Sequence, residues 1–148
     1  MTDSSPTPEL EEKKQLARRI PEDVLTEGDL DLLDELYTED AVEHTPSGDV
    51  EGRTGLQNAY EGFRAAFPDV SLTVEDIVAE GDSVAMRLVV QGAHEGQFMG
   101  GIEPTGQEFE VQKWALTRIK NGMIIERWVL PDMFGMLTQL GIIEPSTG

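Results

Sequence analysis

The residue best suited to chemistry is an aspartate that follows a strand-like run and precedes a cluster of apolar side chains. Asp132 comes directly after Pro131 and before Met133 and Phe134. Apolar surroundings disfavour the ionised form of a carboxylate and therefore raise its pKa. Such a group can take up and release a proton at a pH nearer to neutrality. A position between a proline and a short apolar segment also suits the N-cap of a helix. Asp132 can therefore be a catalytic acid/base, a helix cap, or both.

Two histidines and two strand arginines are further candidates for contact with a ligand. His44 follows a short extended segment, and His94 ends a strand that carries Arg87. Each histidine either bonds a substrate oxygen or is an ordinary exposed or core side chain. Arg87 and Arg118 would stabilise a developing enolate or bind a substrate carboxylate if they point inward. If they point outward, they would form weak surface pairs with glutamates.

Aromatic and methionine side chains concentrate after residue 97. They would form the walls of a pocket for a flat hydrophobic ligand, or simply belong to the core. Arg127 is expected to point outward, because it alternates with Trp128. The residues predicted to line a pocket are Phe98, Trp114, Trp128, Phe134 and Met136.

Composition excludes several functions. The chain has 148 residues, which fits one domain over residues 9–148 after a flexible acidic arm at residues 1–8. With 29 acidic and 11 basic residues, its net charge of −18 opposes binding to nucleic acid or anionic membranes. The absence of cysteine and of HxH or HExxH spacing gives no reason to expect a metal site. The acidity suits a salt-rich cytoplasm, and no membrane segment or signal peptide is expected.

Helical periodicity comes first along the chain. Leu16, Ile20 and Val24 lie on one helical stripe that Pro21 should kink or split. A second helix is expected after a cap at Asp29, and a third after a cap at Thr54. Residues 41–44 are predicted as a short extended piece, and residues 45–53 as a polar loop.

Period-two alternation follows in residues 70–75, 84–91, 109–119 and 123–130. This order predicts an α+β domain in which a curved antiparallel sheet packs on about three N-terminal helices. Both faces of the strands carry apolar residues, whereas a sheet with one wet face alternates cleanly. The helices should cover one face, and the other should enclose a cavity or pair with a second subunit in a homodimer.

Six segments together resemble one known family, the SnoaL-like polyketide cyclase (ester cyclase) family of the nuclear transport factor 2-like superfamily. The segments are GDLDLLDELYTEDAVEH (28–44), AAFPDVSLTVEDIVAEGDSVAMR (65–87), GAHEGQFMG (92–100), EPTG (103–106), KNGMIIERW (120–128) and D-x6-QLG (132–141). The resemblance implies a cone-shaped α+β barrel with an internal pocket. It also implies an intramolecular aldol condensation of a polyketide ester without metal or cofactor. The family's proton-transferring acid matches Asp132, and His44 and His94 are placed at the pocket edge.

The resemblance leaves three functional hypotheses for a small hydrophobic carbonyl compound. The first is a cyclase-type enzyme that uses Asp132, with His44 as a catalytic partner. The second is a non-catalytic binding protein for a small apolar metabolite. The third is an isomerase or hydrolase with the same carboxylate. Gly100-Gly101-Ile102-Glu103 stands where the family has a tighter Gly-Ile-Pro connection, so the pocket mouth should differ in shape.

Overall fold

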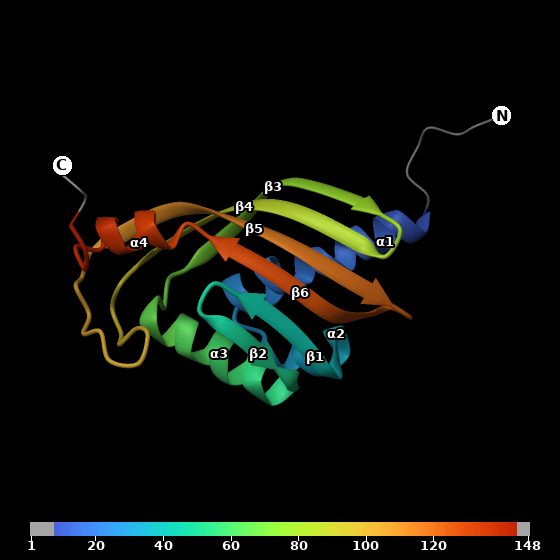
Figure 1. The fold of residues 1–148 in the computed structure, drawn as a ribbon, viewed down its shortest axis with the longest axis horizontal. Helices are drawn as coiled ribbons and strands as arrows, with labels where there is room; N and C mark the ends of the chain where they lie inside the picture. Colours follow the sequence, from blue (N-terminus) through green and yellow to red (C-terminus); the bar gives the residue numbers. More distant parts are fainter. Residues whose placement is uncertain (1–7, 145–148) are drawn as a thin grey trace.

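Helices precede strands along the chain, as the periodicity predicted. The structure is a computed structural model that describes residues 8–144, so residues 1–7 of the expected arm lie outside the described residues. The elements are α1 (Pro8–Arg19), the π-helix η1 (Ile20–Thr26), the 3-10 helix η2 (Leu30–Leu32), α2 (Leu33–Leu36), β1 (Tyr37–Thr45), β2 (Gly48–Glu51), α3 (Gly52–Ala66), β3 (Ser71–Glu80), β4 (Ser83–Ala93), β5 (Glu108–Lys120), β6 (Met123–Pro131) and α4 (Met133–Gln139) (Figure 1). Within the described residues no helix is long and apolar enough to cross a bilayer.

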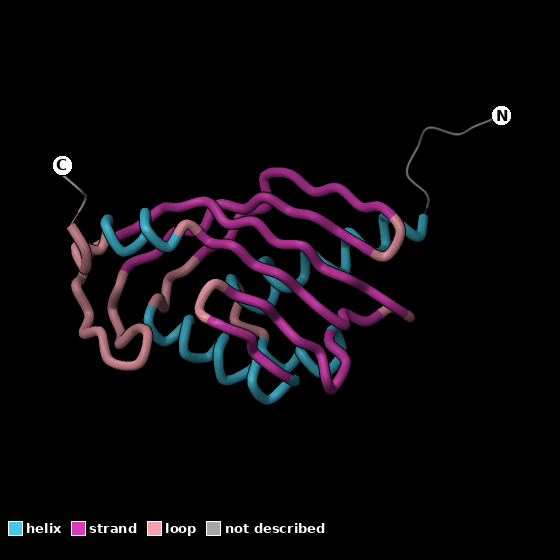
Figure 2. The backbone as a smooth tube through the Cα atoms, viewed as in Figure 1, coloured by secondary structure: helices cyan, strands magenta, loops and turns pink. Residues whose placement is uncertain are grey.

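The strands form one curved sheet in the order β2-β1-β6-β5-β4-β3 (Figure 2). Its neighbours pair antiparallel except β1 and β6, which run parallel. The prediction of a wholly antiparallel sheet is therefore wrong at this one pairing. A parallel partner needs a long connection, and here most of the domain lies between β1 and β6. The sheet does not close, because β2 and β3 remain its edges.

The helices α1 and α3 lie on the same side of the sheet (Figure 1), and that side is called the inner face below. Helix α3 turns Leu56, Tyr60 and Phe63 toward it at helical spacing. Strand β4 does the same with Val84, Met86, Leu88 and Val90, which are buried, while the intervening residues are more exposed. The core thus lies between the helices and the inner face, and the opposite side is called the outer face.

Some helices begin, end or are capped differently from the predictions. The stripe splits at Pro21 as expected, and the split takes the form of the π-helix η1. Asp29 precedes η2 without a capping side-chain hydrogen bond. The predicted cap at Thr54 is wrong, because α3 already begins at Gly52. Gly52 has φ +76°, which lets the chain turn directly from β2 into the helix.

The segment predicted as a polar loop instead forms a hairpin. The short extended piece expected at residues 41–44 belongs to the longer strand β1, and β2 pairs with it between Val42↔Glu51 and Thr45↔Gly48. Alternating polar residues at a sheet edge resemble a loop in sequence, because an edge strand exposes its side chains to water. The turn of this hairpin forms one rim of the pocket described below.

A β-bulge in β6 reverses the expected orientation of Arg127. Ile119 pairs with Ile124 but Arg118 pairs with Glu126, so Ile125 is an extra residue in β6. Past this point every side chain changes face relative to strict alternation. The prediction that Arg127 points outward is wrong: its side chain is 1% exposed on the inner face.

Candidate active site

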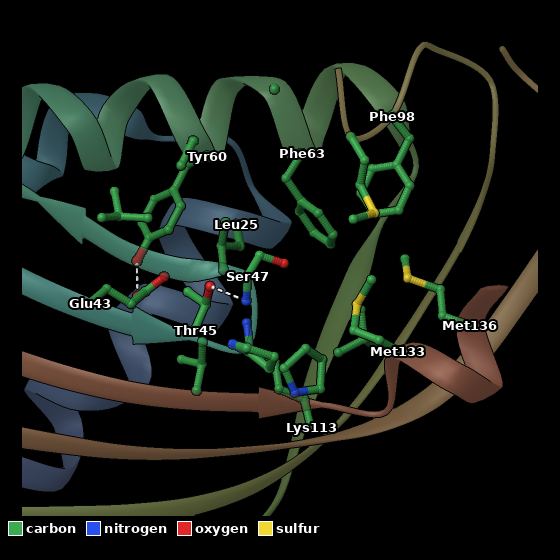
Figure 3. A pocket seen from close by; sticks show the side chains of 18 of the residues that line it. Leu25, Glu43, Thr45, Ser47, Tyr60, Phe63, Phe98, Lys113, Met133 and Met136 are labelled. Carbon is green, nitrogen blue, oxygen red and sulfur yellow. Dashed lines mark hydrogen bonds between the residues drawn. The ribbon is translucent and has the colours of Figure 1, made fainter. Parts of the chain in front are cut away.

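The inner face of the sheet, α3, α4 and the loop after β4 enclose a pocket of about 430 Å³. One end is polar and the other is apolar (Figure 3). The polar end is formed by Glu43 and Tyr60, together with the turn of the β1–β2 hairpin. The residues whose side chains form the apolar end include Phe63, Phe98, Phe109, Met133 and Met136.

At the polar end an arginine and a glutamate form a buried ion pair. Arg127 Nη1 donates to Glu43 Oε1 at 2.6 Å, and the two side chains are 1% and 6% exposed. The Tyr60 hydroxyl donates to the same oxygen at 2.7 Å. The other glutamate oxygen, Oε2, has no hydrogen-bond partner among the described residues. Because Glu43 lines the pocket, this carboxylate can accept a hydrogen bond from a ligand hydroxyl.

Two buried tyrosines support the polar end, and of these Tyr60 lines the pocket. Tyr37 and Tyr60 lie 2.7 Å apart at their hydroxyls, and since Tyr60 donates to Glu43, Tyr37 must donate to Tyr60. Burial raises the pKa of Tyr37 to about 12, against an opposing effect of the Arg127 charge. Burial, with the Glu43 charge, also raises the pKa of Tyr60 well above its usual value. Both phenols therefore keep their protons at physiological pH. Tyr60 holds Glu43 in place, and Tyr37 in turn holds Tyr60.

Lys113 supplies the one basic side chain among the described residues that line the pocket. It belongs to the inward-facing set of β5, between Val111 and Ala115. Its Nζ has no hydrogen-bond or ion-pair partner among the described residues. Burial lowers the pKa of Lys113 to about 8, the Arg127 charge adds to this effect, and the Glu43 charge opposes it. A substantial fraction of the amine is thus neutral near pH 8, when it can accept a proton or attack a carbonyl.

The loop from His94 to Gln107 positions Phe98 in the apolar end. His94 is fully buried, and its Nδ1 accepts a hydrogen bond from the Thr105 backbone N–H at 3.1 Å. The Phe98 and Ile102 backbones bond each other, and the turn between them needs φ of +49° at Met99 and +74° at Gly100. This glycine turn, which sequence comparison with the family marked as unusual, forms part of the pocket wall.

The structure places Asp132 as the N-cap of α4. Its Oδ1 accepts a hydrogen bond from the Gly135 N–H at 2.9 Å, and its side chain is exposed. The capping role considered from sequence is confirmed. Pro131 and Met133 line the pocket but Asp132 does not, so the catalytic role of Asp132 stays a prediction.

His44, the second predicted catalytic residue, lies on the outer face. Its Nδ1 is 2.8 Å from Asp49 Oδ1 and its Nε2 is 2.6 Å from Glu126 Oε2. Both hydrogen bonds raise the pKa of His44, and the bond to Glu126 has the larger effect. The ring also stacks on Trp128 at 5.1 Å between centroids. His44 is therefore committed to neighbours away from the pocket.

Of the side chains predicted to bind substrate, the structure brings only Phe98 and Met136 into the pocket. Arg87 pairs with Asp76 at 2.7 Å, and Arg118 lies over the Trp128 ring. The residues found outside the pocket wall are His94, Arg87, Trp114, Arg118, Trp128 and Phe134. His94 is buried behind Phe98, whereas Trp114 and Phe134 are 54% and 62% exposed.

Sequence reasoning did not single out Glu43, Tyr60 or Lys113. The sequence did contain a signal for Lys113. It follows Phe109 and Val111 at every second position of a strand, which places its side chain on the same apolar face. No such signal exists for Glu43, whose role depends on Arg127 and hence on the bulge. Among the described residues no three His, Asp or Glu side chains are placed to hold a metal ion.

Comparison with known proteins places this fold and pocket in a family. The model of the SnoaL-like polyketide cyclase family matches residues 15–140. IdmH of Streptomyces antibioticus, a candidate polyketide cyclase, is 37% identical with TM-score 0.75, covering 87% of this chain and 98% of its own. AclR of Streptomyces galilaeus, a candidate hydroxylase, is 30% identical with TM-score 0.80, covering 93% and 85%. A comparison with curated proteins found no match. The chain belongs to the SnoaL-like polyketide cyclase family.

Proposed function

We propose that the protein is a cofactor-free enzyme that closes a ring in a hydrophobic carbonyl compound by an aldol-type reaction. The observation that carries this proposal is the unpaired Lys113 amine inside a pocket that has an apolar end and a carboxylate end. Family membership supports the reaction type, because IdmH is a candidate polyketide cyclase. The pocket volume of about 430 Å³ lies within the range of small-molecule sites.

The proposed steps require a base, a bound carbon acid and a proton donor. The neutral amine of Lys113 takes a proton from the carbon next to a carbonyl, and the resulting enolate carbon attacks a second carbonyl of the same molecule. The new alkoxide then takes a proton back from the Lys113 ammonium, so the base is regenerated. A pH near 8 is close to the pKa of Lys113, so that both its neutral and its protonated forms are present for the two transfers.

The two ends of the pocket would orient the substrate. Phe63, Phe98 and Met133 would hold its apolar part, and a hydroxyl or enol group would donate to Glu43 Oε2. The buried pair with Arg127 fixes the position of Glu43, so that this acceptor is in place before binding. Holding both reacting carbons of one molecule in a pocket favours ring closure over reaction with solvent.

Exchange of an acidic C–H for deuterium tests the proposal without knowledge of the natural substrate. The probe is 2-tetralone, a bicyclic ketone, and the exchange rate in D2O is followed by NMR at pH 8. The wild type should accelerate exchange, and Lys113→Met should lower the enzymatic rate by about 10²-fold or more, the scale of a lost general base. Lys120→Met, at an exposed lysine on the same strand, should leave the rate unchanged.

Two outcomes would contradict this assignment. If 2-tetralone binds, as shown by broadened ligand signals, but its exchange stays at the buffer rate, the protein is a binding protein. If Asp132→Asn abolishes exchange while Lys113→Met retains it, the base is Asp132, as the family resemblance implied.

A further inference from the structure

The chain has four lysines, and Lys113 differs from the other three in its surroundings. Lys13 pairs with Asp82 at 3.3 Å, and Lys14 pairs with Glu11 at 3.3 Å. Lys120 ends β5 at an exposed position. Lys113 alone projects into a pocket without an ion-pair partner, in a protein where acidic residues greatly outnumber basic ones.

The one carboxylate on the described pocket wall forms its ion pair with Arg127 and not with Lys113. Among the described lining residues Glu43 is the sole acidic side chain, and its Oε1 is taken by Arg127 and Tyr60. A lysine needed merely as a positive charge would be stabilised by a carboxylate of its own. Lys113 has no such partner in the described part of the chain, and burial lowers its pKa to about 8, so that more of its amine is in the uncharged, nucleophilic form than in an exposed lysine.

We propose that Lys113 is a nucleophile that forms an iminium bond with a carbonyl group of the pocket ligand. The inference rests on the proposed ring closure and deepens it by assigning a covalent step to Lys113, in place of direct proton removal by its free amine. The Nζ lone pair attacks the carbonyl carbon and a C–N bond forms. The oxygen receives one proton from the attacking nitrogen and one from solvent, the C–O bond breaks, and the oxygen leaves as water. The product is a positively charged iminium ion, with no oxidant or reductant consumed.

The iminium ion would help the ring closure in a defined way. Its positive charge makes the neighbouring C–H more acidic, so that Oε2 of Glu43 takes that proton and leaves an enamine. The enamine carbon attacks the second carbonyl, and the new alkoxide takes the proton back from Glu43. Glu43 is the nearby charge of opposite sign, and its negative charge favours a cation at Lys113. Water then hydrolyses the bond and returns the free amine. Lys113 thus serves as the nucleophile, and Glu43 carries the transferred proton.

Reductive trapping tests this step separately from proton exchange. The probe is 2-naphthaldehyde, which has no α-hydrogen, with sodium cyanoborohydride as the reductant. Peptide mass spectrometry then locates the reduced adduct among the four lysines of the intact wild-type protein. At pH 8 we expect the adduct at Lys113 to form at least about 10-fold faster than at any other lysine, since neutral amines react first. Its rate should rise with pH through about 8, following the Lys113 pKa.

A spectroscopic signature and matched variants complete the experiment. Benzoylacetone should give an absorbing enaminone with the wild type and with Lys120→Met, but not with Lys113→Met. Adducts spread evenly over the lysines, or equal absorbance from Lys113→Met, would overturn the proposal. If Lys113-dependent exchange of 2-tetralone occurs without any trapped adduct, Lys113 is a general base and only the covalent step is wrong. If the wild type gives neither deuterium exchange nor a trapped adduct, the proposed function is wrong as well.

Discussion

Replacement of Arg127 by methionine should destabilise the fold strongly, because it leaves the buried Glu43 carboxylate without its ion-pair partner. The guanidinium lies 2.6 Å from Glu43 Oε1, and it also donates to Tyr60 at 3.1 Å and Thr117 at 3.4 Å. Removal of one partner of a buried ion pair costs about 3–5 kcal/mol. For a domain of this size, each kcal/mol lowers Tm by about 2–4 °C, so the expected decrease in Tm is about 6–20 °C.

Urea denaturation and thermal melting of three variants measure this effect. Arg118→Met is the matched control, because Arg118 is 41% exposed and its distance to Glu126 is 3.8 Å; its cost should stay within about 1 kcal/mol. The double variant Arg127→Met with Glu43→Met should recover part of the loss, since an apolar pair replaces the lone charge. A free energy of unfolding for Arg127→Met within about 1 kcal/mol of the wild type would refute the reasoning.

Four further predictions concern other parts of the molecule. Because the pKa of Lys113 is lowered to about 8 in the fold, the unfolded chain binds more protons than the folded one above that pH. The free energy of unfolding should therefore rise with pH from about 8 toward the ordinary pKa of lysine. Lys113→Met should raise Tm at pH 7, by an amount that shrinks near pH 10. Asp132→Ala should cost about 1 kcal/mol through loss of the α4 cap, whereas Asp132→Asn should cost only a small fraction of that in urea denaturation. The outer face, where Trp114 is 54% and Leu130 63% exposed, should pair two copies of the chain; sedimentation should show a dimer, and Trp114→Glu a monomer of 16.3 kDa. With a net charge of −18, Tm should climb with KCl beyond the first few hundred millimolar, and a Tm independent of salt would show that charge repulsion does not limit stability.

Several features of the protein follow from the sequence alone. The change from helical spacing, as at Leu16, Ile20 and Val24, to period two after Val70 predicts helices followed by strands. Six ordered segments identify the family, which the family match confirms. Pro21 splits the first helix because proline lacks the backbone N–H that would continue the α-helical hydrogen bonds of α1. These features are predictable because each depends on residues close together in the chain.

The composition of the pocket was decided by tertiary structure. Simple alternation placed Trp128 on the pocket side and Arg127 outside, but the extra residue Ile125 exchanges their faces. The parallel pairing of β1 with β6 then brings Glu43 beside Arg127, 84 residues away in sequence. A bulge depends on how two strands pair, and a buried carboxylate is stable only where a distant cation meets it. Lys113 lies on the inner face by a pattern visible in sequence, yet its lowered pKa arises from burial and from Arg127, which only the folded chain supplies.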